Sequence, residues 1–351
     1  MTGRFTLSEQ ENRRIYEKSI APALQECESR EKPKIIILAG QPGAGKSKLT
    51  AQAEREFDSR GGAVSIDIDA LRSEHPDYNR LVRDTPRTAA SEVQNDASAW
   101  GDRLLADARD QNKNIILDGT LKDPQKAETL VRDFKRSGYE VEVRAMAVSK
   151  ETSELGVYER YENAMKNAPG AARWVPEDVR NDAYEGMPRA IDRLESQEDP
   201  EMRADRIRVY GRAPDAAGEP TCLHDSQAPS NVEKSASESI EAERGRVVEL
   251  DEQKIRHDKW MEICEQIKTR DPYLEEPENR RAFELADRER EAKDHLINMD
   301  ETVYYSTDYE CSAEEFERDR QSKLKDGAVS RDLDVSREAD GPDKDGHSPE
   351  R

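Results

Sequence analysis

The sequence predicts an α/β fold in which a parallel sheet is covered by helices on both faces. The first observation is a β-branched run, 34–39, that ends in glycine and precedes a helix-compatible segment from Gly45 to about Phe57. The second is that more short apolar runs follow, each separated from the next by a long helix-compatible stretch. They cover residues 63–68, 114–117, 141–148 and 206–210. Strands that alternate with helices are typical of a parallel sheet with two covered faces.

The composition predicts a folded part and a poorly folded part. Of the 351 residues, 34% are hydrophobic and 38% are charged, which is a poor basis for one core that spans all of them. We therefore place a folded domain at residues 1–213 and an acidic extension of unknown role at residues 214–351. The extension begins with a segment rich in Pro, Ser, Ala and Asp and ends in a polar tail, so we expect it to be largely disordered or loosely helical. Its candidate helices either dock on the folded domain or a partner, or are solvated.

Charge and hydropathy exclude several classes of protein. The formal net charge of −21 disfavours binding to nucleic acid or to an anionic membrane. No apolar run approaches the roughly 20 residues that span a bilayer. The first residues lack the apolar centre of a secretory signal. We therefore expect a cytoplasmic protein with no nucleic-acid partner and no membrane partner.

The first predicted element is a helix over residues 7–29. Ser8 is a candidate N-cap, because Glu11 follows three positions later as in a capping box. Residues 34–39 are then predicted as a buried strand, because the run is apolar throughout and is bounded by glycine. The helix after Gly45 completes a strand–loop–helix unit.

The loop of that unit, GQPGAGKS, has the pattern of a phosphate-binding P-loop. Its glycines let the backbone turn tightly, so that successive N–H groups point at an anion, and the helix behind it adds its positive end. Lys46 is placed to reach the β- and γ-phosphates, and the Ser47 hydroxyl to join the shell of Mg²⁺. We therefore expect ATP or GTP to bind with Mg²⁺. The predicted nucleotide-binding residues are Gly40, Gln41, Pro42, Gly43, Ala44, Gly45, Lys46 and Ser47.

Acidic residues follow the next two predicted strands. Asp67 and Asp69 lie in SIDIDALRSEHP, just past the second strand, and Asp118 follows the third. The corresponding edge of a parallel P-loop sheet faces the nucleotide. One carboxylate of the first pair is therefore expected in the magnesium shell, and the other is expected to accept a proton from an attacking hydroxyl. Asp118 is a further candidate for the magnesium shell. The alternative for the first pair is that both residues only cap the next helix.

One threonine and two arginines complete the candidates. Thr120 is expected to expose its hydroxyl to a substrate in the crevice beyond the strand ends. Arg160 and Arg173 fall on a predicted helix and the loop after it, with Pro169 and Gly170 between them. Two arginines on such a lid neutralise charge that grows on a transferred phosphoryl group. For either arginine alone, a solvated surface role is the ordinary alternative.

Taken together, these motifs resemble the zeta toxins, which are the kinases of bacterial epsilon/zeta and PezAT toxin–antitoxin systems. The matching features are the N-terminal helix, GQPGAGKS, DIDALRSEHP, WGDRLL, LDGT, and RYE followed by Arg173, in the family's order across residues 7–212. The resemblance implies a P-loop kinase fold. It also implies transfer of a phosphoryl group from ATP or GTP, with Mg²⁺, to a sugar hydroxyl of UDP-N-acetylglucosamine, which blocks the use of this cell-wall precursor.

The resemblance implies catalytic roles for four residues. Asp69 is implied as the base that acts on the acceptor hydroxyl, and it therefore also contacts the substrate. Lys46 is implied as a ligand of the nucleotide phosphates. Arg160 and Arg173 are implied as the pair that stabilises the transferred phosphate.

The resemblance also implies which residues bind the acceptor, and here the chain departs from its relatives. Thr120 and Asp102 are implied to contact the sugar nucleotide. Asp102 falls where the family usually has a glutamate, and Asp118 stands where relatives often have one. Both differences concern the identity and the pose of the acceptor, and neither removes the machinery of phosphoryl transfer.

Two other functions and one partner are also considered. The chain is alternatively a kinase for another small hydroxyl substrate, such as a nucleotide, a dinucleotide or an antibiotic, and Asp102 and Thr120 are the discriminating positions. In a different class, it is an interaction protein that acts through its C-terminal extension. Four intact residues argue against that interpretation: Lys46, Asp69, Arg160 and Arg173. From the resemblance alone, a small helical antitoxin that blocks the nucleotide site is implied as a partner.

Overall fold

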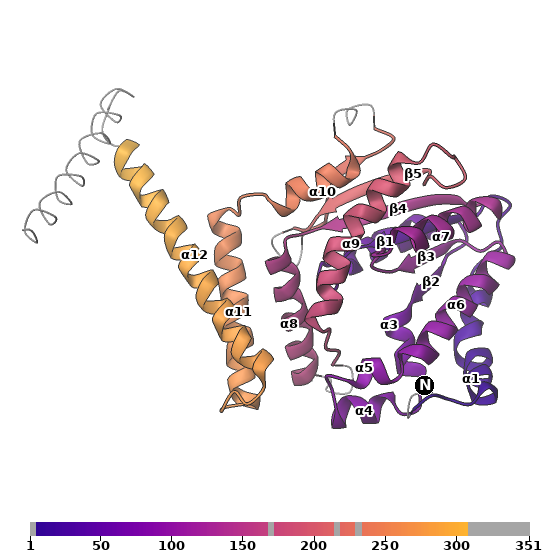
Figure 1. Cartoon of the computed structure of the whole chain (residues 1–351), viewed down its shortest axis with the longest axis horizontal. Coiled ribbons are helices and arrows are strands. Elements are labelled where there is room, and N and C mark those ends of the chain that lie inside the picture. The colour runs from indigo at the N-terminus through magenta and orange to yellow at the C-terminus, as the bar shows by residue number, and fades with distance from the viewer. Residues whose placement is uncertain (1–4, 168–171, 214–217, 229–233, 308–351) are drawn as a thin grey trace, which may run out of the picture. The chain divides into compact units, whose positions relative to one another are not determined.

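The computed structural model describes residues 5–167, 172–213, 218–228 and 234–307 (Figure 1). The chain divides into a compact unit, Met1–Glu291, and a second unit, Ala292–Arg351. The sheet and the candidate site both belong to the first unit. No helix among the described residues is long and apolar enough to cross a membrane.

A mixed sheet forms the centre of the first unit. Its described strands are β1 Lys34–Ala39, β2 Val64–Asp67, β3 Ile115–Asp118, β4 Glu140–Ala147, β5 Arg206–Gly211 and β6 Thr221–Asp225. They lie in the order β2-β3-β1-β4-β5-β6. The first five are parallel, and β6 pairs antiparallel with β5 at one edge. The predicted parallel sheet is therefore confirmed, with an antiparallel edge strand added to it.

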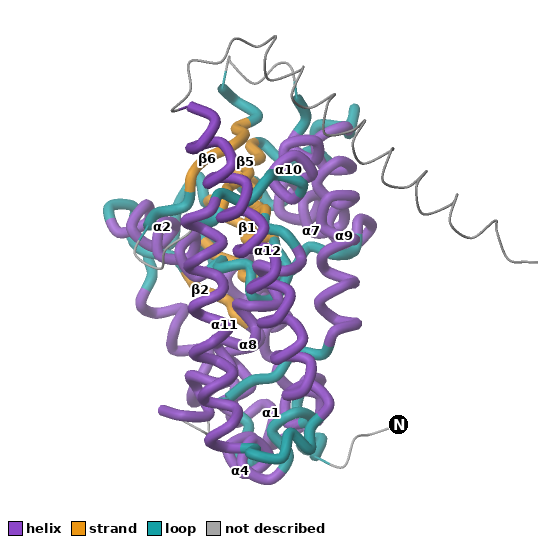
Figure 2. Tube along the Cα trace, turned by 90° about the vertical axis from the view of Figure 1, so that its left-hand side faces the viewer, coloured by secondary structure: helices purple, strands orange, loops and turns teal. Residues whose placement is uncertain are grey.

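Helices cover both faces of this sheet, as predicted. The principal ones are α2 Ser47–Asp58, α6 Gln94–Asp110, α7 Pro124–Arg136, α9 Glu177–Ser196 and α10 Ala236–Arg244. Successive side chains of β1 point to opposite faces. Ile35 and Ile37 pack with α6, α7, α9 and α10, whereas Ile36 and Leu38 pack with α2. Figure 2 shows α2 on one side of the strands, and α7 and α9 on the other.

The N-terminal helix forms, but in three pieces. They are α1 Glu9–Ile15, a π-helical turn Tyr16–Ile20 and a 3-10 helix Ala21–Glu26. The backbone N–H of Glu11 donates to the hydroxyl of Ser8 at 3.3 Å, which confirms the predicted N-cap. Pro22 lies in the 3-10 piece. Because proline lacks an N–H group and crowds the preceding turn, a regular α-helix does not continue through it.

Ordered structure continues past residue 213, where the sequence placed the end of the folded domain. Strand β6 extends the sheet, and α10 buries Ala236 and Ile240 completely in its core. The next helix, α11 Leu250–Arg270, buries Trp260 and Ile267. The apolar residues of this segment are few, but they lie on one helix face. The low average apolar content therefore did not predict that they pack into a core. Residues 308–351, for which disorder was predicted, lie outside the described residues.

A second apolar cluster lies apart from the sheet. It joins α4 Tyr78–Asp84, α5 Ala89–Glu92, α8 Lys150–Asn167, α11 and the first turns of α12 Pro277–Thr307. At its centre, the ring of Tyr158 lies 5.1 Å from that of Trp174 and 5.2 Å from that of Trp260. The cluster therefore fixes α8, the helix that carries Arg160.

Strand β4 also carries a buried network of charges. The Glu142 side chain is fully buried, and its carboxylate lies 2.7 Å from the Lys34 ammonium and 2.7 Å from Nε of Arg144. Glu56 of α2 is a further partner of Arg144. Burial alone raises the pKa of Glu142, but the hydrogen bonds and charges of Arg144 and Lys34 lower it to about 2. The network joins α2 to the sheet through charge as well as through apolar packing.

Candidate active site

The carboxyl ends of β1, β2 and β3 bring the predicted residues of three separate motifs together. Asp118 pairs in register with Leu38 on one side and with Asp67 on the other. The P-loop begins one residue after β1, and α3 Ile68–Leu71 begins directly after β2. Figure 1 shows α3, α6 and α8 below this sheet. Polar side chains from the motifs therefore meet at one edge.

The P-loop is held against α8 by contacts that allow no side chain. Gly43 has a φ of 84°, and a Cβ placed on it would lie 2.0 Å from the carbonyl oxygen of Ser153. A Cβ on Gly156 of α8 would lie 2.3 Å from the Gly43 carbonyl oxygen. Two glycines on different elements thus let the two backbones touch.

Lys46 lies between the P-loop and β3. Its ammonium donates to the carbonyl oxygen of Gly40 at 2.9 Å and lies 3.6 Å from the Asp118 carboxylate. The next residue, Ser47, begins α2. The lysine is therefore positioned at the mouth of the loop, next to a strand-end carboxylate, in agreement with the location predicted for it.

The two aspartates after β2 have different local roles. Asp67 accepts a hydrogen bond from the backbone N–H of Asp69 at 2.8 Å, which makes it the N-cap of α3. The capping alternative therefore holds for Asp67. The Asp69 carboxylate instead lies 2.7 Å from the guanidinium of Arg72, and its side chain is 39% exposed. Asp69 thus presents a carboxylate that is partly open to a ligand.

The Asp118 side chain is more buried than that of Asp69, with 26% of it exposed. Burial raises the pKa of Asp118, the Lys46 ammonium lowers it, and the charges of Asp67 and Asp69 raise it again. Within the described residues, no three His, Cys, Asp or Glu side chains are arranged to hold a metal by themselves. This arrangement fits Mg²⁺, which commonly binds one or two carboxylates together with substrate phosphates and waters. Ser47, Asp67 and Asp118 stay the residues predicted to hold it.

The predicted pair of arginines lies in the same electrostatic cluster. Burial lowers the pKa of Arg160, the charge of Arg173 lowers it further, and the charges of Asp69 and Asp67 raise it. Atoms Nε and Nη2 of Arg160 are buried and have no hydrogen-bond partner among the described residues. A guanidinium with buried, unpaired donors is suited to an anionic ligand.

The two residues predicted to bind the acceptor are less well defined. Asp102 is exposed on α6, and the adjacent Gly101 packs on Ile68 of α3. Thr120 is half-buried in the segment after β3. In the described part of the chain, neither side chain makes a hydrogen bond or an ion pair. Their assignment to an acceptor stays a prediction.

Sequence reasoning missed two residues of this cluster. Arg72 binds Asp69 and also donates from Nε to the Gln94 amide oxygen at 3.0 Å. The sequence contained a signal for this pair, because Arg72 follows Asp69 by three residues at the start of a helix and such side chains lie on one face. Tyr78, the first residue of α4, has a buried hydroxyl with no hydrogen-bond partner. No sequence pattern indicates that hydroxyl, because the ring alone accounts for a tyrosine in an apolar cluster.

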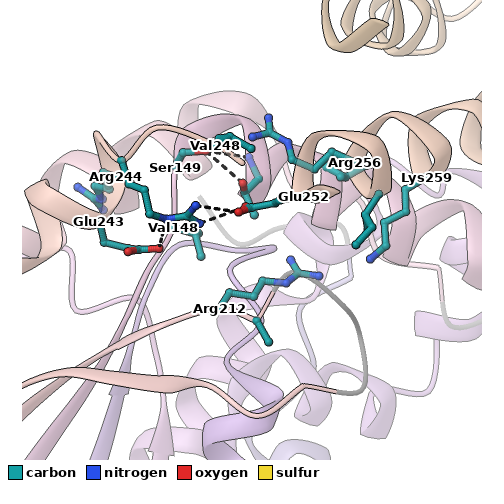
Figure 3. Close-up of a pocket in the computed structure, with 14 residues that line it drawn as sticks. Val148, Ser149, Arg212, Glu243, Arg244, Val248, Glu252, Arg256 and Lys259 are labelled. Atoms are coloured by element: carbon teal, nitrogen blue, oxygen red, sulfur yellow. Dashed lines mark hydrogen bonds and ion pairs between the residues drawn. The ribbon is translucent and has the colours of Figure 1, made fainter. Parts of the chain in front are cut away.

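A hollow lies beside the P-loop, on the side of α10 and α11 (Figure 3). It has about 570 Å³ of empty space, its open mouth included. Arg212, which follows β5, lines it and donates to the Gly43 carbonyl oxygen at 3.2 Å. Further lining residues are Val148, Ser149, Thr152, Glu243, Arg244, Arg246, Val248, Glu252, Arg256 and Lys259. Basic side chains outnumber acidic ones, so the hollow suits a ligand that carries negative charge.

Comparison with known proteins shows the family that the chain resembles. A family model described as zeta toxin matches residues 18–229. The toxin zeta of Streptococcus pyogenes is 27% identical over 190 residues, which is 54% of this chain and 65% of that protein. The toxin PezT of Streptococcus pneumoniae serotype 4 is 27% identical over 199 residues, which is 57% of this chain and 74% of that protein. The chain thus spans 65% of the length of the first relative.

Solved structures show the likeness of the fold. A structure of the PezAT chromosomal toxin–antitoxin system of Streptococcus pneumoniae has a TM-score of 0.61 and is 22% identical, covering 74% of this chain and 98% of that one. The complex of AvrRxo1-ORF1 with AvrRxo1-ORF2 has a TM-score of 0.51 and is 16% identical, covering 80% of this chain and 83% of that one.

Proposed function

The chain belongs to the zeta toxin family, and from that membership we propose that it is a kinase toxin that transfers the γ-phosphoryl group of ATP or GTP to a sugar hydroxyl of UDP-N-acetylglucosamine. The observation that carries the proposal is the convergence of Lys46, Asp69 and Arg160 at one edge of the sheet. Phosphoryl transfer depends on positioning and on neutralising charge, and these are the groups that it requires. We expect the kinase to act in the cytoplasm.

The residues divide the reaction between them. The N–H groups of the P-loop and the Lys46 ammonium bind the β- and γ-phosphates. The Asp69 carboxylate accepts the proton of the acceptor hydroxyl. The oxygen of that hydroxyl bonds to the γ-phosphorus, and the bond between the γ-phosphorus and the bridging oxygen of the nucleoside diphosphate breaks. Arg160 and Arg173 neutralise the charge on the transferred group. When bound, Mg²⁺ neutralises phosphate charge, and Ser47 with Asp67 and Asp118 would hold it.

The basic hollow beside the P-loop is proposed to receive the ribose and base of the nucleotide. Arg212 touches both this hollow and Gly43, so a nucleotide with its phosphates in the loop has the hollow directly beside it. Residues 243–259 form one wall. That segment lies beyond the residues that the family model matches, so this chain would complete its nucleotide site with its own C-terminal helices.

An antitoxin partner is proposed from the relatives. One structural neighbour is a toxin–antitoxin system and another is a two-protein complex. A small helical protein that covers the P-loop edge would block the nucleotide. This proposal is separate from the kinase reaction, and it is tested by co-expression with the antitoxin of a related system.

A different acceptor is the second candidate function. The observation that favours it is Asp102, which is exposed on α6 and is one methylene shorter than the usual glutamate. A shorter carboxylate reaches less far toward a sugar nucleotide. Another small hydroxyl substrate, such as a nucleotide, a dinucleotide or an antibiotic, would then be the acceptor.

A radiolabelled transfer assay tests the proposed function. The full chain is incubated with γ-labelled ATP, Mg²⁺ and UDP-N-acetylglucosamine, beside the Asp69→Asn variant and a reaction without acceptor. A labelled sugar nucleotide that forms only with the unchanged chain is the expected result. Hydrolysis of ATP without a labelled sugar would exclude this acceptor and leave the nucleotide site standing. Absence of both reactions would contradict the kinase assignment.

A further inference from the structure

Tyr78 contributes a hydroxyl that the fold itself does not use. The residue is 3% exposed, and its ring packs in the apolar cluster of α4, α5 and α8. The hydroxyl is buried and has no hydrogen-bond partner among the described residues. A buried polar group without a partner destabilises a protein, and such groups are uncommon. Phenylalanine would provide the same ring without this cost.

Charged residues of the candidate active site act electrostatically on this hydroxyl. The positive charges of Arg72, Arg173 and Arg160 act on it, as does the negative charge of Asp69. Arg160 likewise has two buried donor atoms without a partner. Donors therefore gather at this point from α8 and α4 in excess of acceptors. A ligand that satisfies them must be rich in acceptor oxygens and negatively charged, which describes a phosphoryl group.

The Tyr78 hydroxyl is suited to donate to such a ligand. Burial raises the pKa of Tyr78, and although three arginines lower it, the net change is upward. The hydroxyl therefore keeps its proton at neutral pH and acts as a donor.

We propose that Tyr78 is a further catalytic residue, whose hydroxyl donates a hydrogen bond to an oxygen of the phosphoryl group in transfer, beside Arg160. The proposal rests on the proposed kinase function. No covalent bond to the tyrosine is formed, and its proton stays on the phenol oxygen. The hydrogen bond is strongest when the transferred group carries its greatest charge, so that it lowers the barrier more than it strengthens ground-state binding.

The test is the Tyr78→Phe variant, with Tyr139→Phe as a matched control. We expect Tyr78→Phe to lower kcat about 10- to 100-fold, the loss typical of one hydrogen bond to a charged group. The KM for ATP should change less than about twofold, and the Tm should be unchanged or higher. The Tyr139 hydroxyl donates to the Lys113 carbonyl oxygen at 2.9 Å, just before the start of β4 and at the opposite edge of the sheet from the site. Tyr139→Phe should therefore lower the Tm and leave kcat unchanged.

A second readout does not depend on the identity of the acceptor. In a Lys46→Ala background, which weakens anion binding at the P-loop, inorganic phosphate should still raise the Tm through the arginine cluster. Adding Tyr78→Phe should reduce that rise. If the unchanged chain phosphorylates no UDP-N-acetylglucosamine, the proposed acceptor fails, and the phosphate-dependent Tm still decides the role of Tyr78. An unchanged kcat together with an unchanged phosphate effect, or a Tm loss as large as that of Tyr139→Phe, would overturn the proposal.

Discussion

At the scale of single residues, Asp69 and Asp67 show how two adjacent carboxylates divide their work. The Asp67 carboxylate accepts a hydrogen bond from the backbone N–H of Asp69. The Asp69 carboxylate instead pairs with the guanidinium of Arg72 and stays partly exposed. The cap fixes the start of α3, and α3 holds the carboxylate that is proposed to act as the base. The Asp67 carboxylate thus positions the backbone, and the Asp69 carboxylate, two residues later, is proposed to perform the chemistry.

The first prediction concerns Asp69. Asparagine keeps the size of the side chain and one oxygen for Arg72, but it cannot serve as a base at neutral pH. Asp69→Asn is therefore expected to lower kcat about 10²- to 10⁴-fold, while the Kd for ATP is nearly unchanged. Rapid-quench kinetics and titration calorimetry measure the two quantities. Asp84→Asn, at an exposed position on α4, is the control, and wild-type turnover in Asp69→Asn would remove this residue from the mechanism.

The sequence predicted the positions of these residues better than their contacts. Asp67, Asp69 and Asp118 were recognised because they follow apolar runs that end at one edge of a parallel sheet. The pairing of Asp69 with Arg72 and the unpaired hydroxyl of Tyr78 were not, because they depend on side-chain packing in three dimensions. Proximity of Arg160 and Arg173 was inferred only through the order of the family's motifs.

At the scale of elements, β4 combines apolar packing with the buried charges of Glu142, Arg144 and Lys34. The five strands predicted from the sequence were recognisable as short apolar runs bounded by polar residues or glycine. Strand β6 and helix α10 were not predicted, since their segment is mostly polar, and docking of the candidate helix that forms α11 was left as one of several alternatives. A candidate helix there was indicated by the near-helical spacing of Ile255, Trp260, Ile263 and Ile267.

The second prediction is a pH-dependent stability difference at Glu142. Its folded-state pKa of about 2 lies below the ordinary value of 4.5, so its ion pairs stabilise the fold fully above pH 4.5 and are lost as the pH falls through about 2. Glu142→Gln should cost about 3–5 kcal/mol at pH 7, because it leaves Lys34, Arg144 and Arg208 short of a buried partner. Chemical denaturation at pH 7, 4 and 2.5 should show the difference shrinking as the pH falls.

Glu140→Gln is the matched control for that experiment. Glu140 lies on the same strand and also pairs with Lys34, but its side chain is 49% exposed. Its replacement should cost no more than about 1 kcal/mol. Equal losses for the two variants would mean that burial of Glu142 does not determine the strength of the network.

The third prediction concerns the hollow formed by β4, β5 and the C-terminal helices. Val248→Trp should fill it, while Val247 is 77% exposed outside the hollow, so that Val247→Trp is the control. We expect Val248→Trp to weaken binding of ATP about tenfold or more, and to leave binding of tripolyphosphate unchanged. Tripolyphosphate has the phosphates but no base or ribose. If ATP binds the two variants equally and tripolyphosphate does too, the nucleotide base lies outside the hollow.

At the scale of the whole molecule, the compact unit ends at Glu291 rather than near residue 213. Helix α11 packs against α8, and the Tyr158 hydroxyl donates to the Glu278 carbonyl oxygen at 2.8 Å. Segments beyond the family-matched region therefore belong to the same core as the helix that carries Arg160.

The fourth prediction is that one of two truncations leaves the fold unchanged and the other destabilises it. Removal of residues 292–351 should leave the Tm and the kinase activity unchanged. Removal of residues 214–351 should expose the apolar sides of α8 and β5, and should yield an aggregated or much less stable chain. Thermal unfolding and size-exclusion chromatography distinguish the two. A stable, active chain of residues 1–213 would show that the later helices are accessory.

The contact between Gly43 and Gly156 has a consequence for genetics. Any missense change at a glycine codon adds at least a Cβ, and at either position that atom would lie 2.0 to 2.3 Å from a carbonyl oxygen. In cells selected to survive expression of this chain, inactivating mutations are expected at Gly156 as well as at Lys46. Gly156 would then appear in the spectrum of survivors as often as a residue that binds phosphate, although it carries no side chain with which to bind anything.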